Sequence, residues 1–555
     1  MTFWCTFWLT IGVAFSTCLG DHQRAGDPVR AYNIELSQLA SEARDAGHAK
    51  LAKEISDWYI CRDPERQYLF GTAEGEAARP DWENNKYWDK FIQLRQEQAI
   101  SLWKVADHEF ETGDLERALQ IVHELLREDP DNVRARAMLG FEQREDGWLR
   151  TSRTTSVRPG KQKHPKFGWP AGSYWKIDSE HFQIVTNHSS ALASGLAATL
   201  EDFHNGWRQL FTRFWLNRAA FGRVWNGQSS VPAGRKRFRI VVFRDRDEYV
   251  RSLKSTEPNI DISMGVYLHR RRATFLYAGE QADPMSTWRH EVTHQLLHET
   301  LKAGGDVGGR SNFWIIEGIA LYMESWHDFG SYVTVGGIDA ERLQYARHRA
   351  LSDGFQLPVA DMVALSREAL QTDSRIRQIY SQAAGMAHFL IDGDGGRYRD
   401  GLLSYLRKVY AAHDELTTLA AVVGRSYQEL DSLYLQYLNV NDERLLSLPE
   451  PGNVTMLHLG DTQITDAGIK AIRVQSQLQW LDLSGCPITD EGLHWMANHG
   501  QIQELYLHGT LVSDASIETL KTLSNLKILD VSETNVSAAG LSRLVETLPH
   551  LKVVQ

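Results

Sequence analysis

The segment HEVTH holds two histidines, His290 and His294, one helical turn apart, with Glu291 directly after the first. Because a helix advances about 100° and 1.5 Å per residue, both imidazoles project from one face and can share one cation. Zinc in hydrolases typically takes three protein ligands, often two histidines and a glutamate, and its remaining position holds water with a pKa of about 7. Glu291 lies at the edge of the same face and would take the proton of that water.

Glu317 is the expected third ligand of this site. The pattern predicts one helix over 286–301 and a second helix that begins after Asn312, whose side chain can cap it. His298 continues the row of histidines, but it lies two turns from His290, about 12 Å along the axis, which is too far for zinc bonds near 2 Å. The alternative for this region is an amphipathic helix with solvated histidine and glutamate side chains.

The segments HEVTH and WIIEGIALYMES together resemble the gluzincin metallopeptidases, in particular the aminopeptidases and leukotriene hydrolase. The resemblance implies that His290, His294 and Glu317 hold one Zn²⁺ ion. It also matches Glu324 to the later glutamate of the family, and the i+7 spacing returns Glu324 to the face of Glu317, where it could orient a ligating histidine. The segment IYSQAAGMAHFLI looks like the family's helix that opens with a tyrosine, which implies that Tyr380 hydrogen-bonds the developing oxyanion. The alternative for this tyrosine is the start of a buried helix.

One segment departs from the aminopeptidase pattern. Aminopeptidases grip the amino terminus of their substrate with a G-A-M-E-N segment, whereas this chain has SMGVYLHRRRATFLYAG at 263–279. That stretch resembles the edge strand of the broader peptidase-MA-like bacterial domains. Nothing in the sequence assigns the nearby Glu280 to binding a free amine, so aminopeptidase specificity is unsupported.

Composition and charge limit the class of protein. The chain has 555 residues, 42% of them hydrophobic and 24% charged, which is typical of globular material in several domains. The formal net charge of -11 argues against a nucleic-acid-binding protein. Residues 1–20 include a long apolar run without charged groups, which predicts a signal peptide or, as the alternative, an uncleaved membrane anchor. The protein is therefore expected to be exported to the periplasm, the cell envelope or the extracellular space, and to touch a membrane only through this segment.

The patterns divide the rest of the chain into a multidomain α+β protein. Residues 30–150 are predicted to be helical, and 101–132 resembles one tetratricopeptide unit, which must pack on its neighbours. Residues 151–172 are polar, basic and rich in glycine and proline, which indicates a linker or a surface loop. Residues 173–445 are expected to form a zincin-like α+β peptidase domain, with strands first and helices afterwards.

Residues 454–555 repeat with one spacing, because similar segments begin at 457, 481, 505 and 529, which is a period of about 24 residues. The L-x-L strand and a threonine or cysteine at the turn recur in each unit, which predicts a leucine-rich repeat α/β solenoid. Cys486 occupies the offset that threonine has in the other units. A protein partner on the strand face and a purely stabilising role both remain open.

The sequence therefore predicts a zinc metallopeptidase that cleaves a peptide or protein substrate by a metal-activated water. The alternative is a catalytically inactive zinc-domain scaffold that binds proteins through its tetratricopeptide-like and leucine-rich repeat regions. That alternative gives no reason to keep Glu291, which does not bind metal, or a tyrosine placed like Tyr380. A third hypothesis is a zinc hydrolase of a non-peptide substrate, because the same chemistry serves other electrophiles.

Overall fold

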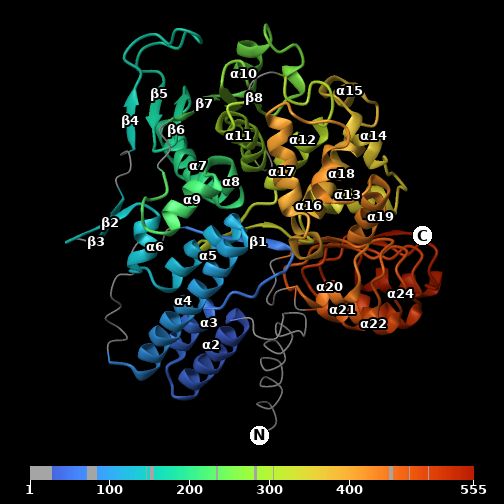
Figure 1. The fold of residues 1–555 in the computed structure, drawn as a ribbon. Helices are drawn as coiled ribbons and strands as arrows, with labels where there is room; N and C mark the ends of the chain where they lie inside the picture. The colour runs from blue at the N-terminus through green and yellow to red at the C-terminus, as the bar shows by residue number, and fades with distance from the viewer. Residues whose placement is uncertain are drawn as a thin grey trace.

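The structure is a computed structural model of the chain (Figure 1). It describes residues 28–71, 84–145, 147–150, 155–232, 236–279, 284–303, 306–448, 454–473, 475–497 and 499–555. The predicted signal peptide or anchor, residues 1–20, lies outside these ranges. Within them, no helix combines the length and the apolar character that crossing a bilayer requires.

Helices form most of the described part of the chain up to residue 140, and a run of short strands follows. The helices are α2 (Pro28–Asp45), α3 (Ala49–Trp58), α4 (Lys86–Thr112), α5 (Leu115–Glu128) and α6 (Val133–Met138). Helices α4 and α5 fold back on one another through Gly113, whose φ of 98° favours glycine, and Asp114 caps α5. This pair is the helical hairpin expected around 101–132. The prediction of helix throughout 30–150 is wrong in part, because the region also contains β1 (Arg66–Phe70), β2 (Phe141–Arg144) and β3 (Gly147–Arg150).

A mixed sheet of six strands forms the next layer, in the order β4-β5-β6-β7-β9-β8. Its strands are β4 (Ser156–Pro159), β5 (Trp175–Asp178), β6 (Phe182–Thr186), β7 (Phe238–Phe243), β8 (Val266–Leu268) and β9 (Ala273–Tyr277). Strands β6, β7 and β9 are parallel to one another, and the other neighbouring strands pair antiparallel. Strand β8 stands last in the strand order and is therefore an edge strand. Strand β4 lies inside 151–172, so the prediction of a linker or loop there is wrong for the residues that pair with β5.

Helices connect and cover this sheet. They are α7 (Ser190–Leu210), α8 (Thr212–Trp215), α9 (Arg218–Trp225) and α10 (Arg246–Leu253), with a short 3-10 turn η2 (Ile260–Ile262). Helix α7 packs on β5 and β6, and its buried face belongs to the largest hydrophobic core of the molecule. Strands β6 and β7 lie on either side of α7 in the sequence, which agrees with the expectation that strands come early in residues 173–445.

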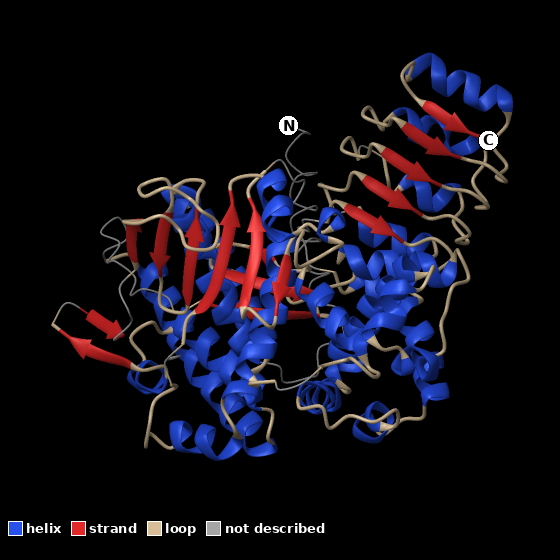
Figure 2. Cartoon of the chain, turned by 90° about the horizontal axis from the view of Figure 1, so that it is seen from above, coloured by secondary structure: helices blue, strands red, loops and turns tan. Residues whose placement is uncertain are grey.

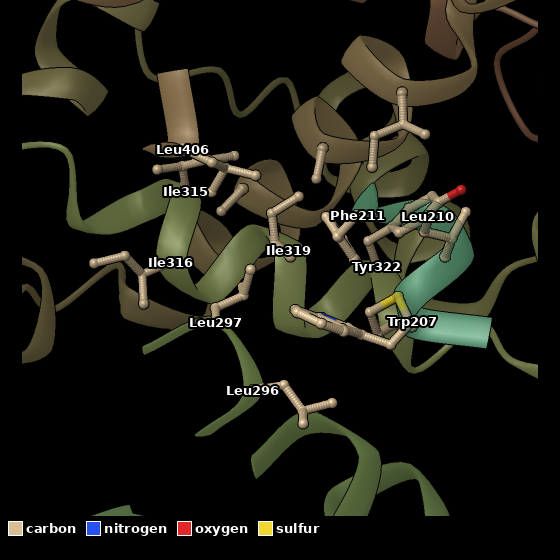
Figure 3. Packing of buried hydrophobic residues seen from close by; sticks show 14 of the residues in the cluster. Trp207, Leu210, Phe211, Leu296, Leu297, Ile315, Ile316, Ile319, Tyr322 and Leu406 are labelled. Atoms are coloured by element: carbon tan, nitrogen blue, oxygen red, sulfur yellow. The ribbon is translucent and has the colours of Figure 1, made fainter. Parts of the chain in front are cut away.

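Three helices carry the predicted chemistry: α11 (Pro284–Thr300), α12 (Phe313–Met323) and α16 (Ile376–Gly396). Helix α11 packs on β8 and β9, and α12 packs on both α11 and α16. Every residue of α12 is buried, as expected for a helix that is apolar all round. Figure 3 shows how Leu296 and Leu297 of α11 lie in the same core as Ile319 of α12. A Cβ on Gly318 would lie 2.7 Å from the Ala383 carbonyl oxygen, so glycine permits the close approach of α12 and α16.

The rest of the region up to residue 448 is mainly helical. Its helices are α13 (Glu341–Leu351), α14 (Val359–Ala364), α15 (Arg367–Thr372), α17 (Arg399–Tyr410), α18 (Thr418–Val423), α19 (Tyr427–Leu438) and α20 (Asp442–Leu446). The expectation of helices alone after the site is wrong, because β10 (His327–Asp328) and β11 (Tyr332–Gly336) follow α12. Strand β11 pairs antiparallel with β1, with Leu69 opposite Val333. The amino-terminal helical region and the residues after 172 therefore share a sheet.

The carboxy-terminal repeats form a second sheet of five parallel strands, which Figure 2 shows as a separate stack. The strands are β12 (Met456–His458), β13 (Trp480–Asp482), β14 (Glu504–Tyr506), β15 (Ile528–Asp530) and β16 (Lys552–Val554). The helical segments between them are α21 (Asp466–Ile472), α22 (Asp490–His494), η3 (Asp514–Ser516), α23 (Ile517–Lys521) and α24 (Ala538–Thr547). Leu457, Leu481, Leu505 and Leu529 lie in register and are fully buried. The predicted period and strand positions are confirmed.

A buried arginine joins the repeats to the helical part of the chain. Arg347 of α13 is fully buried, and it donates hydrogen bonds to the carbonyl oxygens of His458 (2.9 Å) and Leu438 (3.1 Å). Burial lowers the pKa of Arg347 to about 10, so the guanidinium stays charged at neutral pH. The side chain of Gln344 accepts a hydrogen bond of 2.6 Å from the His458 amide. The first repeat is therefore fixed against α13.

Candidate metal centre

The three predicted ligands come together between α11 and α12. The Nε2 atoms of His290 and His294 lie 3.2 Å apart. One carboxylate oxygen of Glu317 lies 3.5 Å from Nε2 of His290 and 3.8 Å from Nε2 of His294. Two imidazole nitrogens and one carboxylate oxygen from distant parts of the sequence thus face one point.

These spacings suit a shared divalent cation. Zinc bonds of about 2.0–2.2 Å at tetrahedral angles place neighbouring ligand atoms about 3.3 Å apart. The distances between the three donor atoms, 3.2, 3.5 and 3.8 Å, bracket that spacing. Two nitrogen donors and one oxygen donor are also a set that zinc accepts, with a further position left for water or substrate. The residues present therefore fit the ion that the sequence predicts.

Glu324 orients one of the two imidazoles. Its carboxylate accepts a hydrogen bond of 2.8 Å from Nδ1 of His290, and its other oxygen accepts one of 2.7 Å from Nε of Arg342. An acceptor at Nδ1 keeps a proton on that nitrogen and leaves the Nε2 lone pair directed at the shared point. The side chain of Glu324 is only 10% exposed, so solvent competes little for this contact.

The charges of the cluster are strongly coupled. Burial alone would lower the pKa of His290, but hydrogen bonds to Glu317 and Glu324 raise it well above its ordinary value. Burial lowers the pKa of His294 to about 4. Burial opposes ionisation of Glu317, yet the two histidines and a hydrogen bond from Tyr380 hold its pKa below the usual range. At neutral pH the ionised carboxylate of Glu317 thus faces a protonated His290 and a neutral His294, and a divalent cation would take the place of the proton on Nε2 of His290.

Glu291 lies beside the three ligands without joining them. Its carboxylate accepts a hydrogen bond of 2.7 Å from the backbone amide of Tyr267 on the edge strand β8. Burial, assisted by the negative charge of Glu317, raises the pKa of Glu291. A half-buried carboxylate with a raised pKa, close to a cation site but not bound to it, is suited to accept and return a proton.

Tyr380 reaches the same point from the second turn of α16. Its phenol hydrogen-bonds Glu317, and burial together with that carboxylate raises its pKa, so the hydroxyl stays protonated at neutral pH. A protonated phenol can donate to an oxyanion that forms nearby. The structure thus brings Tyr380 to the three ligands.

Asn312 and His298 do not belong to the set of three expected ligands. Asn312 is the N-cap residue of α12, but its side chain makes no capping hydrogen bond, so that part of the prediction is wrong. Its φ of 59° is left-handed, and its amide nitrogen donates to Asp414 at 2.8 Å while its oxygen accepts from Tyr405. His298 lies outside the cluster, as expected, and its Nδ1 is 3.1 Å from the hydroxyl of Tyr267.

The cluster opens into a cavity of about 1010 Å³. The edge strand β8 lines one side of it, and His290, Glu291, His294, Glu317 and Tyr380 all face it. Sequence reasoning missed three further lining residues, Arg367, Tyr410 and Tyr267. The segments of Arg367 and Tyr410 carry no local motif, and only the tertiary fold brings them to the cavity, whereas Tyr267 lies in the segment 263–279 that resembles an edge strand.

A second set of metal-binding residue types, His181, Glu201 and His204, also lies together. Here Nδ1 of His181 is only 2.6 Å from a Glu201 oxygen, which is a direct hydrogen bond and shorter than the spacing of two ligands around one zinc ion. Burial raises the pKa of Glu201, but hydrogen bonds from His181 outweigh it and lower the pKa overall. We interpret this set as a hydrogen-bonded pair of His181 and Glu201 that anchors α7 to the turn before β6.

Comparison with known families gives two matches. Residues 284–413 match a family described as "Protein of unknown function (DUF1570)", and residues 453–472 and 478–494 match a leucine-rich repeat model. No curated protein matches the chain. The first match covers α11, α12 and α16 and thus every residue of the candidate centre, although its description names no activity. The second match confirms the leucine-rich repeats.

Proposed function

We propose that the protein is a zinc-dependent hydrolase of gluzincin type, and that its substrate is a peptide or protein. The observation that carries this proposal is the convergence of His290, His294 and Glu317 with a second carboxylate, Glu291, that lies half-buried beside them and is not part of the ligand set. A site that only binds metal has no use for such a carboxylate.

The three ligands and their neighbour have separate tasks. His290, His294 and Glu317 would hold the ion, and Glu324 would keep the His290 ring in the ligating orientation. A bound zinc ion supplies a water with a pKa near 7 and polarises the carbonyl group to be cleaved. Arg342 pairs with the outer oxygen of Glu324 and so neutralises a charge that would otherwise be buried alone.

Glu291 would carry the proton through the reaction. Its raised pKa places it closer to neutrality than an exposed glutamate, which suits a group that must first take a proton from water and later give it to the leaving amine. The Tyr267 amide fixes one of its oxygens and leaves the other free for this task. Glu291 belongs to α11 and faces the cavity, where substrate would lie.

Tyr380 and the edge strand would handle the substrate itself. The phenol of Tyr380 can donate to the oxygen of the carbonyl under attack, in place of its present hydrogen bond to Glu317. Among the described residues, strand β8 pairs on one side only, with β9, and it borders the cavity. An extended peptide could therefore add its backbone to this edge.

A second candidate function concerns the repeats. Leucine-rich repeats in general mediate protein–protein interactions, and the strand face of β12 to β16 would be the binding surface in this chain. In the scaffold hypothesis this is the whole function and the metal centre is inactive. The positions of Glu291 and Tyr380 favour the hydrolase. Export of the protein through residues 1–20 remains part of the proposal.

The test compares the wild type with Glu291→Gln on a peptide library, with the zinc content of both proteins measured. We expect the variant to keep its zinc and lose hydrolysis by several orders of magnitude, because only the proton carrier is removed. Glu257→Gln is the matched control, since this acidic residue lines the same cavity and has no part in the chemistry. Equal rates for the wild type and Glu291→Gln would remove Glu291 from the mechanism. Zinc without cleavage in both would favour the scaffold.

A further inference from the structure

The hydroxyl of Tyr410 is buried without a hydrogen-bond partner among the described residues. Tyr410 ends α17, is 2% exposed, and lines the cavity of the metal centre. A buried hydroxyl that forms no hydrogen bond destabilises the fold, so such a group usually has a partner, which can be an ordered water, an ion or a ligand. An acceptor in the cavity would satisfy this hydroxyl.

An arginine lines the same cavity. Arg367 is the first residue of α15, and its Nη2 donates a hydrogen bond of 2.8 Å to the Val307 carbonyl oxygen, while its guanidinium lies 5.3 Å from the centre of the Phe313 ring. Its only carboxylate neighbour among the described residues is Asp306 at 3.6 Å, which is 72% exposed and therefore a weak partner. A guanidinium has five N–H donors, and these contacts leave several of them available.

The positive charge of Arg367 interacts electrostatically with residues of the candidate metal centre. It acts electrostatically on Tyr410 and on His294, one of the three expected ligands. The two histidines next to this part of the cavity do not add charge at neutral pH, because burial lowers the pKa of both His269 and His298, the latter to about 4. Arg367 therefore supplies a fixed positive charge to the cavity that holds the three expected ligands, and the Tyr410 hydroxyl lines the same cavity as a neutral donor.

We propose that Arg367 and Tyr410 form a subsite that binds a carboxylate of the substrate next to the metal centre. The proposal rests on the proposed hydrolase function and adds the substrate class, namely peptides that place a carboxylate in this part of the cavity. A guanidinium and a phenol are suited to this ligand, since one supplies charge and paired donors and the other a single donor. The carboxylate can be the carboxyl terminus of the peptide or the side chain of an aspartate or glutamate, and the test distinguishes the two.

The experiment uses matched peptides chosen from sequences that the wild type cleaves. Each peptide is made with a free carboxyl terminus and as the carboxamide, and each acidic side chain is replaced by its amide. We expect the wild type to prefer one carboxylate form about tenfold or more in kcat/KM, mainly through KM. A preference for acid over carboxamide identifies the terminus, and a preference for glutamate over glutamine identifies the side chain.

Two variants and two controls locate the subsite. Arg367→Gln and Tyr410→Phe should bring the preference for the carboxylate form toward one. Tyr410→Phe should not lower the melting temperature, because its hydroxyl has no partner to lose. Tyr434→Phe is the matched control, since that hydroxyl is also buried without a partner but lies outside the cavity. Arg270→Gln removes an exposed arginine that lines the same cavity and should leave the preference unchanged.

A binding measurement separates failure of the subsite from failure of the hydrolase. Calorimetric titration of Glu291→Gln with the same peptide pairs should show tighter binding of the carboxylate form, and Arg367→Gln in that background should abolish the difference. Equal cleavage and equal binding of both forms would overturn the subsite and leave the hydrolase standing. Selective binding without any cleavage by the wild type would overturn the hydrolase and leave the subsite standing. An equal loss of preference in Arg270→Gln would show that the preference depends on the total positive charge around the cavity. That result would overturn the assignment to Arg367.

Discussion

Replacing Glu324 by alanine should weaken metal binding without removing any ligand. The carboxylate accepts a hydrogen bond of 2.8 Å from Nδ1 of His290 and is only 10% exposed, so water cannot readily take its place. Loss of such an acceptor typically lowers metal affinity by about 10–100-fold, which corresponds to about 1.4–2.7 kcal/mol. Glu324→Gln keeps an oxygen that can accept from Nδ1 and loses only the charge, so we expect a smaller effect of about threefold to tenfold.

The assay is a competition titration for zinc against a coloured chelator at constant pH and ionic strength. Glu341→Gln is the control, because this exposed glutamate opens α13 beside Arg342 and makes no contact with the ligands. The wild type and the control should agree, and the affinity should fall in the order wild type, Glu324→Gln, Glu324→Ala. An affinity of Glu324→Ala within twofold of the wild type would refute the view that Glu324 orients His290.

Three further predictions concern the reaction, the junction of the repeats and the pH dependence of stability. Tyr380→Phe should lower kcat by about 100-fold or more with little change in KM or zinc content, since it removes one oxyanion donor; steady-state kinetics test this. Arg347→Met should lower the free energy of unfolding in urea by about 2–4 kcal/mol, because buried carbonyl groups lose a charged donor. Burial raises the pKa of Asp392 to about 8, whereas its value in the unfolded chain is near 4. Between these two values the folded chain keeps a proton that the unfolded chain releases. The contribution of Asp392 to the free energy of unfolding therefore falls by about 1.4 kcal/mol for each pH unit of increase. Urea titrations should therefore show Asp392→Asn gaining stability relative to the wild type between pH 5 and pH 8.

Neighbouring residues provide controls for these changes. Arg349→Met removes an exposed arginine from the same helix as Arg347 and should cost little. Asp394→Asn changes an exposed aspartate two residues after Asp392 and should show no such pH dependence. A stability difference between Asp392→Asn and the wild type that is constant from pH 5 to pH 8 would contradict the raised pKa. A normal kcat in Tyr380→Phe would remove the phenol from the reaction.

The convergence of the three expected ligands could be predicted because local geometry decides most of their arrangement. Two histidines at i and i+4 share a helix face whatever surrounds them, and Glu317 stands in a segment so apolar that its helix had to be buried. The repeats were also predictable, since their period fixes the register of one strand on the next. The position of Tyr380 at the site could be predicted only from the resemblance to the gluzincin family, because a tyrosine near the start of a helix carries no signal of its own.

The missed features all depend on contacts between distant segments. Strand β1 pairs with β11 across more than 250 residues, and neither segment predicts the other. Strand β4 belongs to a polar, basic stretch, and it is ordered by pairing with β5 and not by its own composition. Arg367 and Tyr410 come to the cavity from separate helices. The side chain of Asn312 bonds Asp414 and Tyr405 because a tertiary partner competes with the local cap.

The most direct test of the central claim is X-ray diffraction from crystals of the zinc-loaded protein at energies on either side of the zinc absorption edge. The account predicts one strong anomalous peak about 2 Å from Nε2 of His290, Nε2 of His294 and a carboxylate oxygen of Glu317. The peak should disappear in His294→Ala. A map without a peak at these three groups, or with zinc bound only elsewhere, would contradict the account.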